Sequence, residues 1–318
     1  MTQWQESMLV EGRVLVIGAA GLDVVGRLRA ELEDGTSAPA HIRSSFGGVA
    51  RNVAENLARL GVETALLSAV GDDDVGVQLL HHLDAAGVDT RFVQRIPGMA
   101  TGSYLAVLNE SGGLRFALDD MRVLQAITSE YIKKHADLFA SADMLFLDTN
   151  LASGVLRTVF SLARQAKVPV LADPTATGLA TRLLPYLNRL YCVAPNAREA
   201  AVLSGITFEE SDIQGALHAA RSLVSAGVKI AVITLGEHGV CYATSQGNGY
   251  LPAMRTAIVD PTGAGDALTA ALIVALLNDI PLDDAMRLGV SAASLTLQYR
   301  GAVCPDISLE KLYDDLVV

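Results

Sequence analysis

The sequence predicts an α/β protein with a mostly parallel central sheet and a small β lid. From residue 129 onward, short apolar runs alternate with helical patterns, an order typical of parallel strands joined by right-handed crossovers. Polar residues follow these strands, at the sheet edge where α/β proteins bind their ligands. Before residue 119, short alternating stretches with a hairpin turn interrupt the strand and helix order, and they predict the lid.

The composition fits a globular chain, with 51% hydrophobic and 19% charged residues among 318. The net charge of -11 disfavours a nucleic-acid surface, which needs clustered Lys and Arg. No apolar stretch reaches the roughly 20 residues of a membrane span. The first residues contain Glu6 and Glu11 and lack the basic region of a secretory signal. We therefore expect a cytoplasmic protein that binds neither nucleic acid nor membrane. No zinc site or disulfide is predicted from the separated cysteines Cys192, Cys241 and Cys304.

The chain begins with a short β-branched run over residues 13–17, which predicts a buried strand. A glycine-containing loop follows, and Asp23 lies just past it. This position suits a residue that binds a polar substrate, although an Asp that forms a turn fits equally well.

A second glycine stretch, Gly47-Gly48, stands at the start of a helical pattern that ends at Gly61. Two consecutive glycines allow a ligand to approach the backbone closely. Asn52 lies in the first turn of this helix and offers a donor and an acceptor to a sugar hydroxyl. An ordinary glycine turn with an Asn near the cap is the alternative.

The following elements complete the first half of the chain. A strand over 62–70 and a helix over 75–86 precede alternating stretches at 91–93, 103–108 and 114–118. We expect residues 24–45 and 91–118 to form a lid that excludes water from the site. The absence of repeats and linkers predicts a single domain over residues 1–318.

The second half has the regular alternation of a parallel sheet. The predicted helices cover residues 129–140, 153–166, 179–186 and 283–298, and the predicted strands cover 144–147, 168–172, 190–193, 229–233 and 240–243. After the strand at 229–233, the glycines of Thr234-Leu-Gly-Glu-His-Gly239 permit a tight turn against a nucleotide, or a plain hairpin.

The stretch Asp260-Pro-Thr-Gly-Ala-Gly-Asp266 precedes the apolar run 267–277. Such a loop opens a buried helix with bare amides, which can hold a developing anion. Asp266 would lie in the first helical turn, where its carboxylate could accept a proton from a hydroxyl that attacks a phosphate. A simple glycine turn followed by an Asp that favours the helix dipole is the alternative.

These stretches together resemble both signatures of the ribokinase family, the PfkB carbohydrate kinases. Asn196-Ala-Arg-Glu199 resembles the family's Asn-x-x-Glu motif, and residues 234–239 resemble its nucleotide loop. The resemblance covers nearly the whole chain, is most similar to the pseudouridine kinases, and implies a three-layer ribokinase-like fold. The chain departs from the family pattern at Gly21, where an Asn is usual, at Ala50 and at Pro261.

The resemblance implies ATP-dependent phosphorylation of the 5'-hydroxyl of a nucleoside, with pseudouridine as the expected acceptor. Ribokinase or another sugar or nucleoside kinase is the alternative within the family, and a catalytically silent nucleoside-binding regulator is the alternative outside it. Asp266 would be the general base, and the transferring phosphoryl group would be held by the amides of Gly263, Ala264 and Gly265.

The same resemblance assigns the binding residues. The acceptor would be bound by Asp23, Gly47, Gly48, Asn52 and Thr101, and ATP by Asn196, Thr234, Gly236 and Gly239. Mg2+ would be held by Asn196 and Glu199, and a monovalent cation such as K+ by Asp260 and Thr262. The family likeness also implies a homodimer formed through the lid strands.

Overall fold

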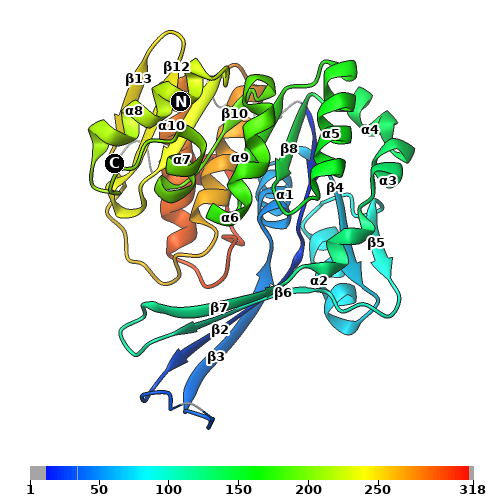
Figure 1. Cartoon of the computed structure of the whole chain (residues 1–318), viewed down its shortest axis with the longest axis vertical. Coiled ribbons are helices and arrows are strands. Elements are labelled where there is room, and N and C mark those ends of the chain that lie inside the picture. Colours follow the sequence, from blue (N-terminus) through cyan, green and yellow to red (C-terminus); the bar gives the residue numbers. More distant parts are fainter. Residues whose placement is uncertain (1–11, 34, 315–318) are drawn as a thin grey trace.

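The structure is a computed structural model that describes residues 12–33 and 35–314 (Figure 1). Glu6 and Glu11 lie outside these residues. The described strands form one large sheet and one small sheet, and helices cover both faces of the large one. None of the described helices combines the length and the apolar character needed to span a bilayer.

The large sheet has nine strands within the described residues, in the order β13-β12-β11-β10-β9-β8-β1-β4-β5. Its neighbouring strands are parallel except at β12 and β13, which pair antiparallel at one edge. The strands are β1 (Arg13–Ile17), β4 (Glu63–Gly71), β5 (Val93–Ile96), β8 (Met144–Asp148), β9 (Val170–Asp173), β10 (Cys192–Val193), β11 (Ile230–Thr234), β12 (Val240–Thr244) and β13 (Asn248–Leu251).

The core lies on both faces of this sheet because successive strand residues point to opposite sides. Val14 and Val16 pack with the first group of helices, whereas Leu15 and Ile17 pack with the second. The first group is α1 (Val49–Arg59), α2 (Asp74–Ala85), α9 (Ala264–Leu277), α10 (Leu282–Leu297) and α11 (Leu309–Asp314). The second is α3 (Ser129–Lys134), α4 (Ala136–Ser141), α5 (Ser153–Ala166), α6 (Thr177–Ala180), α7 (Ala197–Ser204) and α8 (Ile213–Ser225), with the 3-10 helices η1 (Arg122–Ala126) and η2 (Thr181–Arg189). A third 3-10 turn, η3 (Gly236–His238), joins β11 to β12.

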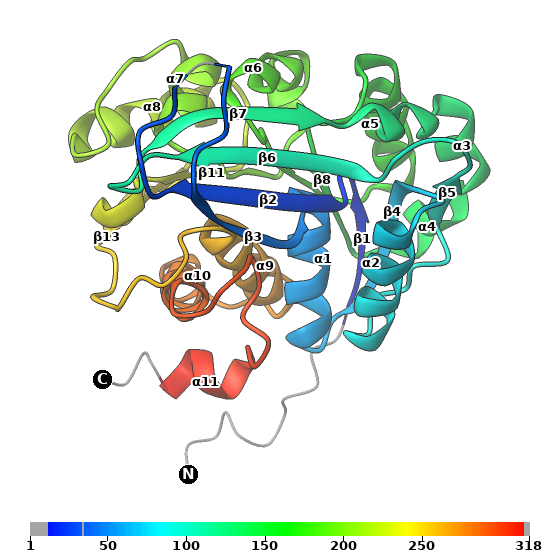
Figure 2. The ribbon, with the colours of Figure 1, turned by 90° about the horizontal axis from the view of Figure 1, so that it is seen from below.

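The small sheet forms the lid, which lies across the end of the large sheet at which β1 finishes (Figures 1 and 2). Its order is β3-β2-β6-β7, with β2 and β6 parallel and the outer pairs antiparallel. The strands are β2 (Gly21–Leu28), β3 (Ala40–Gly47), β6 (Gly102–Leu108) and β7 (Leu114–Asp120). The predicted three-layer fold with a small β lid is therefore confirmed.

Several predicted boundaries differ from the observed ones. Residues 93–96 were predicted in the lid but form β5, which pairs with β4 in the large sheet. The helix predicted over 179–186 is wrong beyond residue 180, where α6 ends. The rest of this range is a 3-10 helix, and it contains Pro185, which lacks the N–H that an α-helix needs. The helix predicted over 129–140 is divided at His135.

Candidate active site

The site is organised around the N-terminus of α9, which begins at Ala264. Gly263 precedes it with a φ of 81°, a left-handed conformation that favours glycine. A Cβ at Gly263 would also overlap the backbone carbonyl of Ala302. No side chain caps this helix, so the first-turn amides, which include those of Ala264 and Gly265, are open to an anion.

Asp266 lies in the first turn of α9 and contacts α1, the helix that follows Gly47-Gly48. Asn52 Nδ2 of α1 donates a hydrogen bond of 2.6 Å to Asp266 Oδ2. The other amide atom, Asn52 Oδ1, is buried and has no partner. A buried acceptor without a donor is costly, so this atom is ready to accept a bond from a ligand hydroxyl. This bond thus brings the segments that follow the two glycine stretches into contact.

The surroundings of the Asp266 carboxyl bring its pKa close to neutral pH. Burial raises its pKa to about 7, although the Asn52 hydrogen bond and the positive charge of Arg51 act in the opposite direction. The nearby carboxyls of Asp148 and Asp23 also raise the pKa. A general base works best with a pKa close to the working pH, so the surroundings of Asp266 suit that role.

This pKa predicts an acid limb in the activity profile. Because Asp266 must be ionised to accept a proton, kcat/KM should fall about tenfold per pH unit below a pH near 7 and level off above it. Asn52→Leu removes a bond that favours the ionised form, so its acid limb should lie at higher pH than that of the unmodified protein. Initial rates from pH 5.5 to pH 9 measure both profiles, and a flat profile in the unmodified protein would contradict the assignment.

The acceptor side of the pocket combines a lid residue with the start of α1. Asp23 lies on β2, not in a loop beyond β1 as the sequence suggested, because the strand resumes at Gly21. Its carboxylate lies where a Cβ of Gly47 would be, so this glycine makes room for it. Gly48 has a φ of 95° and is the N-cap of α1, in close contact with the Ala19 carbonyl. A ligand on this turn would meet Asp23, Asn52 and Asp266.

The packing of the lid strands explains why position 21 is a glycine. A Cβ there would overlap the backbone carbonyl of Gly102, because β2 and β6 approach closely at this register pair. No larger side chain fits between these strands in the observed arrangement, so the polar contact of the usual Asn is lost.

Two residues that the sequence analysis did not assign hold this pocket in place. Asp148 is fully buried at the end of β8, and its Oδ2 accepts hydrogen bonds from the amides of Ala19 (2.7 Å) and Ala50 (3.2 Å). Arg51 is buried beside it and donates to the carbonyls of Phe46 and Gly47. Both fix the loop that precedes α1. Asp148 follows the predicted strand 144–147, at the sheet edge where ligands bind, whereas no local pattern marks Arg51.

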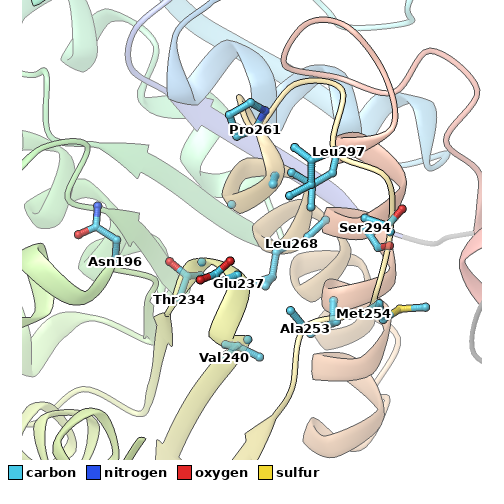
Figure 3. A pocket seen from close by; sticks show the side chains of 18 of the residues that line it. Asn196, Thr234, Glu237, Val240, Ala253, Met254, Pro261, Leu268, Ser294 and Leu297 are labelled. Atoms are coloured by element: carbon cyan, nitrogen blue, oxygen red, sulfur yellow. The ribbon is translucent and has the colours of Figure 1, made fainter. Parts of the chain in front are cut away.

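The predicted nucleotide residues line a cavity of about 670 Å³ on the other side of the α9 N-terminus (Figure 3). The set that was predicted for ATP, namely Asn196, Thr234, Gly236 and Gly239, lies in its wall together with Ala264 and Gly265. Apolar side chains complete the wall and suit a flat base: Val240, Ala253, Met254, Leu268, Val290 and Leu297. The sequence analysis missed this apolar wall, which comes from β12, the loop before α9, α9 and α10.

A protein-family comparison matches residues 12–307 to the pfkB family of carbohydrate kinases. The chain belongs to this family. It is 33% identical to the pseudouridine kinase of Escherichia coli, over 93% of this chain and 94% of that protein. It is 26% identical to a guanosine-inosine kinase of Exiguobacterium acetylicum, over 89% and 93% of the two chains. A putative ribokinase II of E. coli, solved with ATP and Mg2+, has the same fold with a TM-score of 0.82 at 18% identity, over 96% of this chain and 99% of that one.

The chain is thus an ATP-dependent sugar or nucleoside kinase, a phosphotransferase. At the predicted Mg2+ site of this pfkB kinase, Asn196 Oδ1 accepts from the Glu199 amide and Glu199 Oε2 accepts from the Asn196 amide, each at 3.0 Å. This capping box leaves Glu199 Oε1 for a ligand. Asp173 lies in the same neighbourhood, and burial and the charges of Glu199 and Asp266 raise its pKa well above the usual range.

These buried carboxyls fit a hard cation, which would favour their ionised forms. Within residues 12–33 and 35–314, no three acidic, His or Cys side chains come close enough to hold a metal by themselves. Mg2+ would therefore share Glu199 and Asp173 with water and the nucleotide phosphates, and it would neutralise charge on those phosphates.

Thr101 does not join the acceptor pocket of this pfkB kinase. Its hydroxyl donates to Asp73 Oδ1 (2.6 Å) and accepts from the Gly71 amide (3.0 Å), and its own amide donates to Asp73 Oδ2. These bonds fasten the segment before β6 to the end of β4 and the start of α2. In this structure Thr101 has a structural role.

Proposed function

We propose that this pfkB kinase phosphorylates the 5'-hydroxyl of a nucleoside and that pseudouridine is its acceptor. The observation that carries the proposal is the hydrogen bond between Asn52 and Asp266, which places the base beside an amide whose oxygen has no partner. The identity with the E. coli pseudouridine kinase over nearly the whole chain supports this choice of nucleoside.

The reaction follows from the arrangement of these groups. Asp23 and Asn52 hold the sugar hydroxyls, and the 5'-oxygen faces Asp266, which takes its proton as the bond to the γ-phosphorus forms. The bond between the γ-phosphorus and the bridging oxygen breaks, and ADP leaves. The amides of Ala264 and Gly265, placed by Gly263, hold the charge on the transferring group. Glu199 and Asp173 would help to hold Mg2+, which would supply further positive charge to the phosphates.

A second cavity supports a nucleoside over a simple pentose. It has a volume of about 610 Å³ and is lined by the end of β7, including Asp119 and Asp120, and by Asn150 and Arg182. Asn150 donates two hydrogen bonds to the same Asp148 carboxyl that holds the start of α1, so the wall of this cavity is linked to the loop that carries the proposed sugar residues. Carboxylates accept N–H groups, and pseudouridine offers two on its base. Because Asp120 already accepts from Arg122 with both oxygens, Asp119 is the wall carboxylate that suits such a group.

A panel of acceptors tests the proposal. With ATP and Mg2+ and coupled detection of ADP, we expect kcat/KM for pseudouridine to exceed that for uridine, guanosine and ribose by at least about tenfold, since one lost hydrogen bond to a charged group costs about 1.5 to 3 kcal/mol. A preference for ribose would favour the ribokinase alternative. Binding of nucleosides without ADP formation would favour the silent regulator.

The predicted homodimer is supported by the outer face of the lid. This face carries exposed apolar side chains that share one side of the sheet: Ile42, Leu105, Phe116 and Leu118. Arg43, Asp23 and Tyr104 alternate with them and occupy the opposite side, which faces the pocket. An exposed apolar surface of this kind is typical of a protein interface.

A further inference from the structure

The predicted monovalent-cation site at Asp260 and Thr262 already holds a positive group. Arg43 of the lid strand β3 reaches across to Asp260 and places both of its terminal nitrogens on the two carboxylate oxygens, with Nη2 at 3.1 Å from Oδ1. The Asp260 side chain is 2% exposed, so the pair is shielded from water on the acid's side. A bidentate guanidinium and carboxylate pair is among the strongest ionic contacts in proteins.

Asp260 has no capacity left for a metal ion. Besides Arg43, its Oδ1 accepts from the amide (3.1 Å) and hydroxyl (2.8 Å) of Thr262, and its Oδ2 accepts from the Gly301 amide (3.0 Å). A carboxylate has about four lone-pair sites, and these contacts fill them. The residues at this position therefore do not fit K+, contrary to the expectation from the sequence.

The position of the ion pair connects it to the anion hole. Thr262 precedes Gly263, the N-cap of α9, and the carbonyl of Ala302, next to Gly301, packs against Gly263. Asp260 thus ties together the two segments that determine where the first-turn amides point. Removing the positive charge would leave a buried carboxylate uncompensated at the base of this loop, and such a loss is costly.

The same ion pair connects the lid to the anion hole. Arg43 pairs in register with Val25, and Ser45 pairs with Asp23, so Arg43 and Asp23 lie on the same side of the lid sheet. A Cβ built at Gly301 would lie 3.8 Å from Ser45 Cβ, so β3 runs beside this loop. The strand pair that carries Asp23 therefore also holds Arg43 at Asp260.

We propose that Arg43 is a positioning residue that takes the place of a monovalent cation in this kinase. Arg43 of the lid then provides the positive charge that fixes the positions of the amides of Ala264 and Gly265. The kinase needs no K+, and its anion hole is complete only when the lid is in place.

Activity with and without K+ tests whether Arg43 takes the place of the cation. In the unmodified protein, replacing K+ by tetramethylammonium at constant ionic strength should change turnover by less than about twofold, because the guanidinium already fills the position. Arg43→Met keeps an unbranched side chain without the charge. The loop before α9 should then shift, and turnover should fall on the order of ten- to a hundredfold. K+ should restore part of that loss, which a merely structural role of Arg43 would not allow.

A second readout needs neither acceptor nor turnover. Thermal unfolding of Arg43→Met should shift to higher temperature in K+ relative to tetramethylammonium, because the vacated Asp260 can now bind the ion, whereas the unmodified protein should show no such shift. This thermal-unfolding measurement remains informative if the preferred acceptor differs from pseudouridine. Arg43→Lys keeps a charge and should keep independence from K+.

The matched control is Arg27→Met. Arg27 lies on the neighbouring lid strand, is exposed, and donates to the Glu110 carbonyl instead of the loop before α9. This variant should match the unmodified protein in both assays. A K+ requirement in the unmodified protein would overturn the proposal, as would unchanged turnover of Arg43→Met or a loss that K+ leaves untouched in both assays. If Arg43→Met does not fold, the unmodified protein and Arg43→Lys still decide it.

Discussion

Asp266→Asn is expected to lower kcat by about 10³- to 10⁴-fold, at the upper end of the contribution of a general base. The substitution keeps the size of the side chain and leaves an amide oxygen to accept the bond from Asn52, so the pocket should keep its shape. It removes the group that accepts the proton of the attacking hydroxyl. Single-turnover measurements with saturating ATP and acceptor would report the chemical step directly.

Ligand binding and stability are the controls for this variant. Affinity for the acceptor, measured by calorimetry, should change little. Burial raises the folded-state pKa of Asp266 to about 7 from an ordinary value of 3.8, so the stability linked to its protonated form is present at acid pH and is lost as the pH rises through 7. Asp266→Asn should therefore gain stability relative to the unmodified protein between pH 4 and pH 8. Near-normal turnover in this variant would remove Asp266 from the role of base.

The sequence predicted the glycines and acids of the site because local backbone geometry demands them. Gly263 and Gly48 have positive φ angles, and each starts a helix at which a ligand can approach the amides. Their meeting was an expectation from family resemblance, and the contact between Asn52 and Asp266 joins residues 214 positions apart. Only the crossovers of the fold bring such residues together.

The residues that escaped prediction act through distant partners. Arg43 and Asp260 are separated by 217 positions, and Asp148 and Ala19 by 129, so no local spacing could have linked them. Asp23 was placed beyond a strand because the glycine-containing loop at 18–21 was interpreted as the end of that strand. The structure instead starts a new strand at Gly21, since pairing with β3 and β6 satisfies its backbone.

Gly263→Ala is expected to have the second largest effect. The new Cβ would require an alanine at a φ of 81° and would overlap the Ala302 carbonyl, so the start of α9 must move. The strain should cost about 1 to 3 kcal/mol of unfolding free energy. A displaced anion-hole donor should lower kcat by roughly 10²- to 10³-fold. Denaturant unfolding and steady-state kinetics measure the two effects separately.

Gly265→Ala separates the strain from the chemistry. A Cβ at Gly265 meets no protein atom within 4 Å, and the residue lies inside the helix, where alanine is favoured over glycine by about 0.5 to 1 kcal/mol. This variant should be as stable as the unmodified protein or more so. Because Gly265 lines the nucleotide cavity, the methyl group should still raise KM for ATP, since it stands where the phosphates approach the amides. Equal kinetics of Gly265→Ala and the unmodified protein would show that the phosphates bind elsewhere, whereas full activity of Gly263→Ala would show that the geometry of this helix start is not required for transfer.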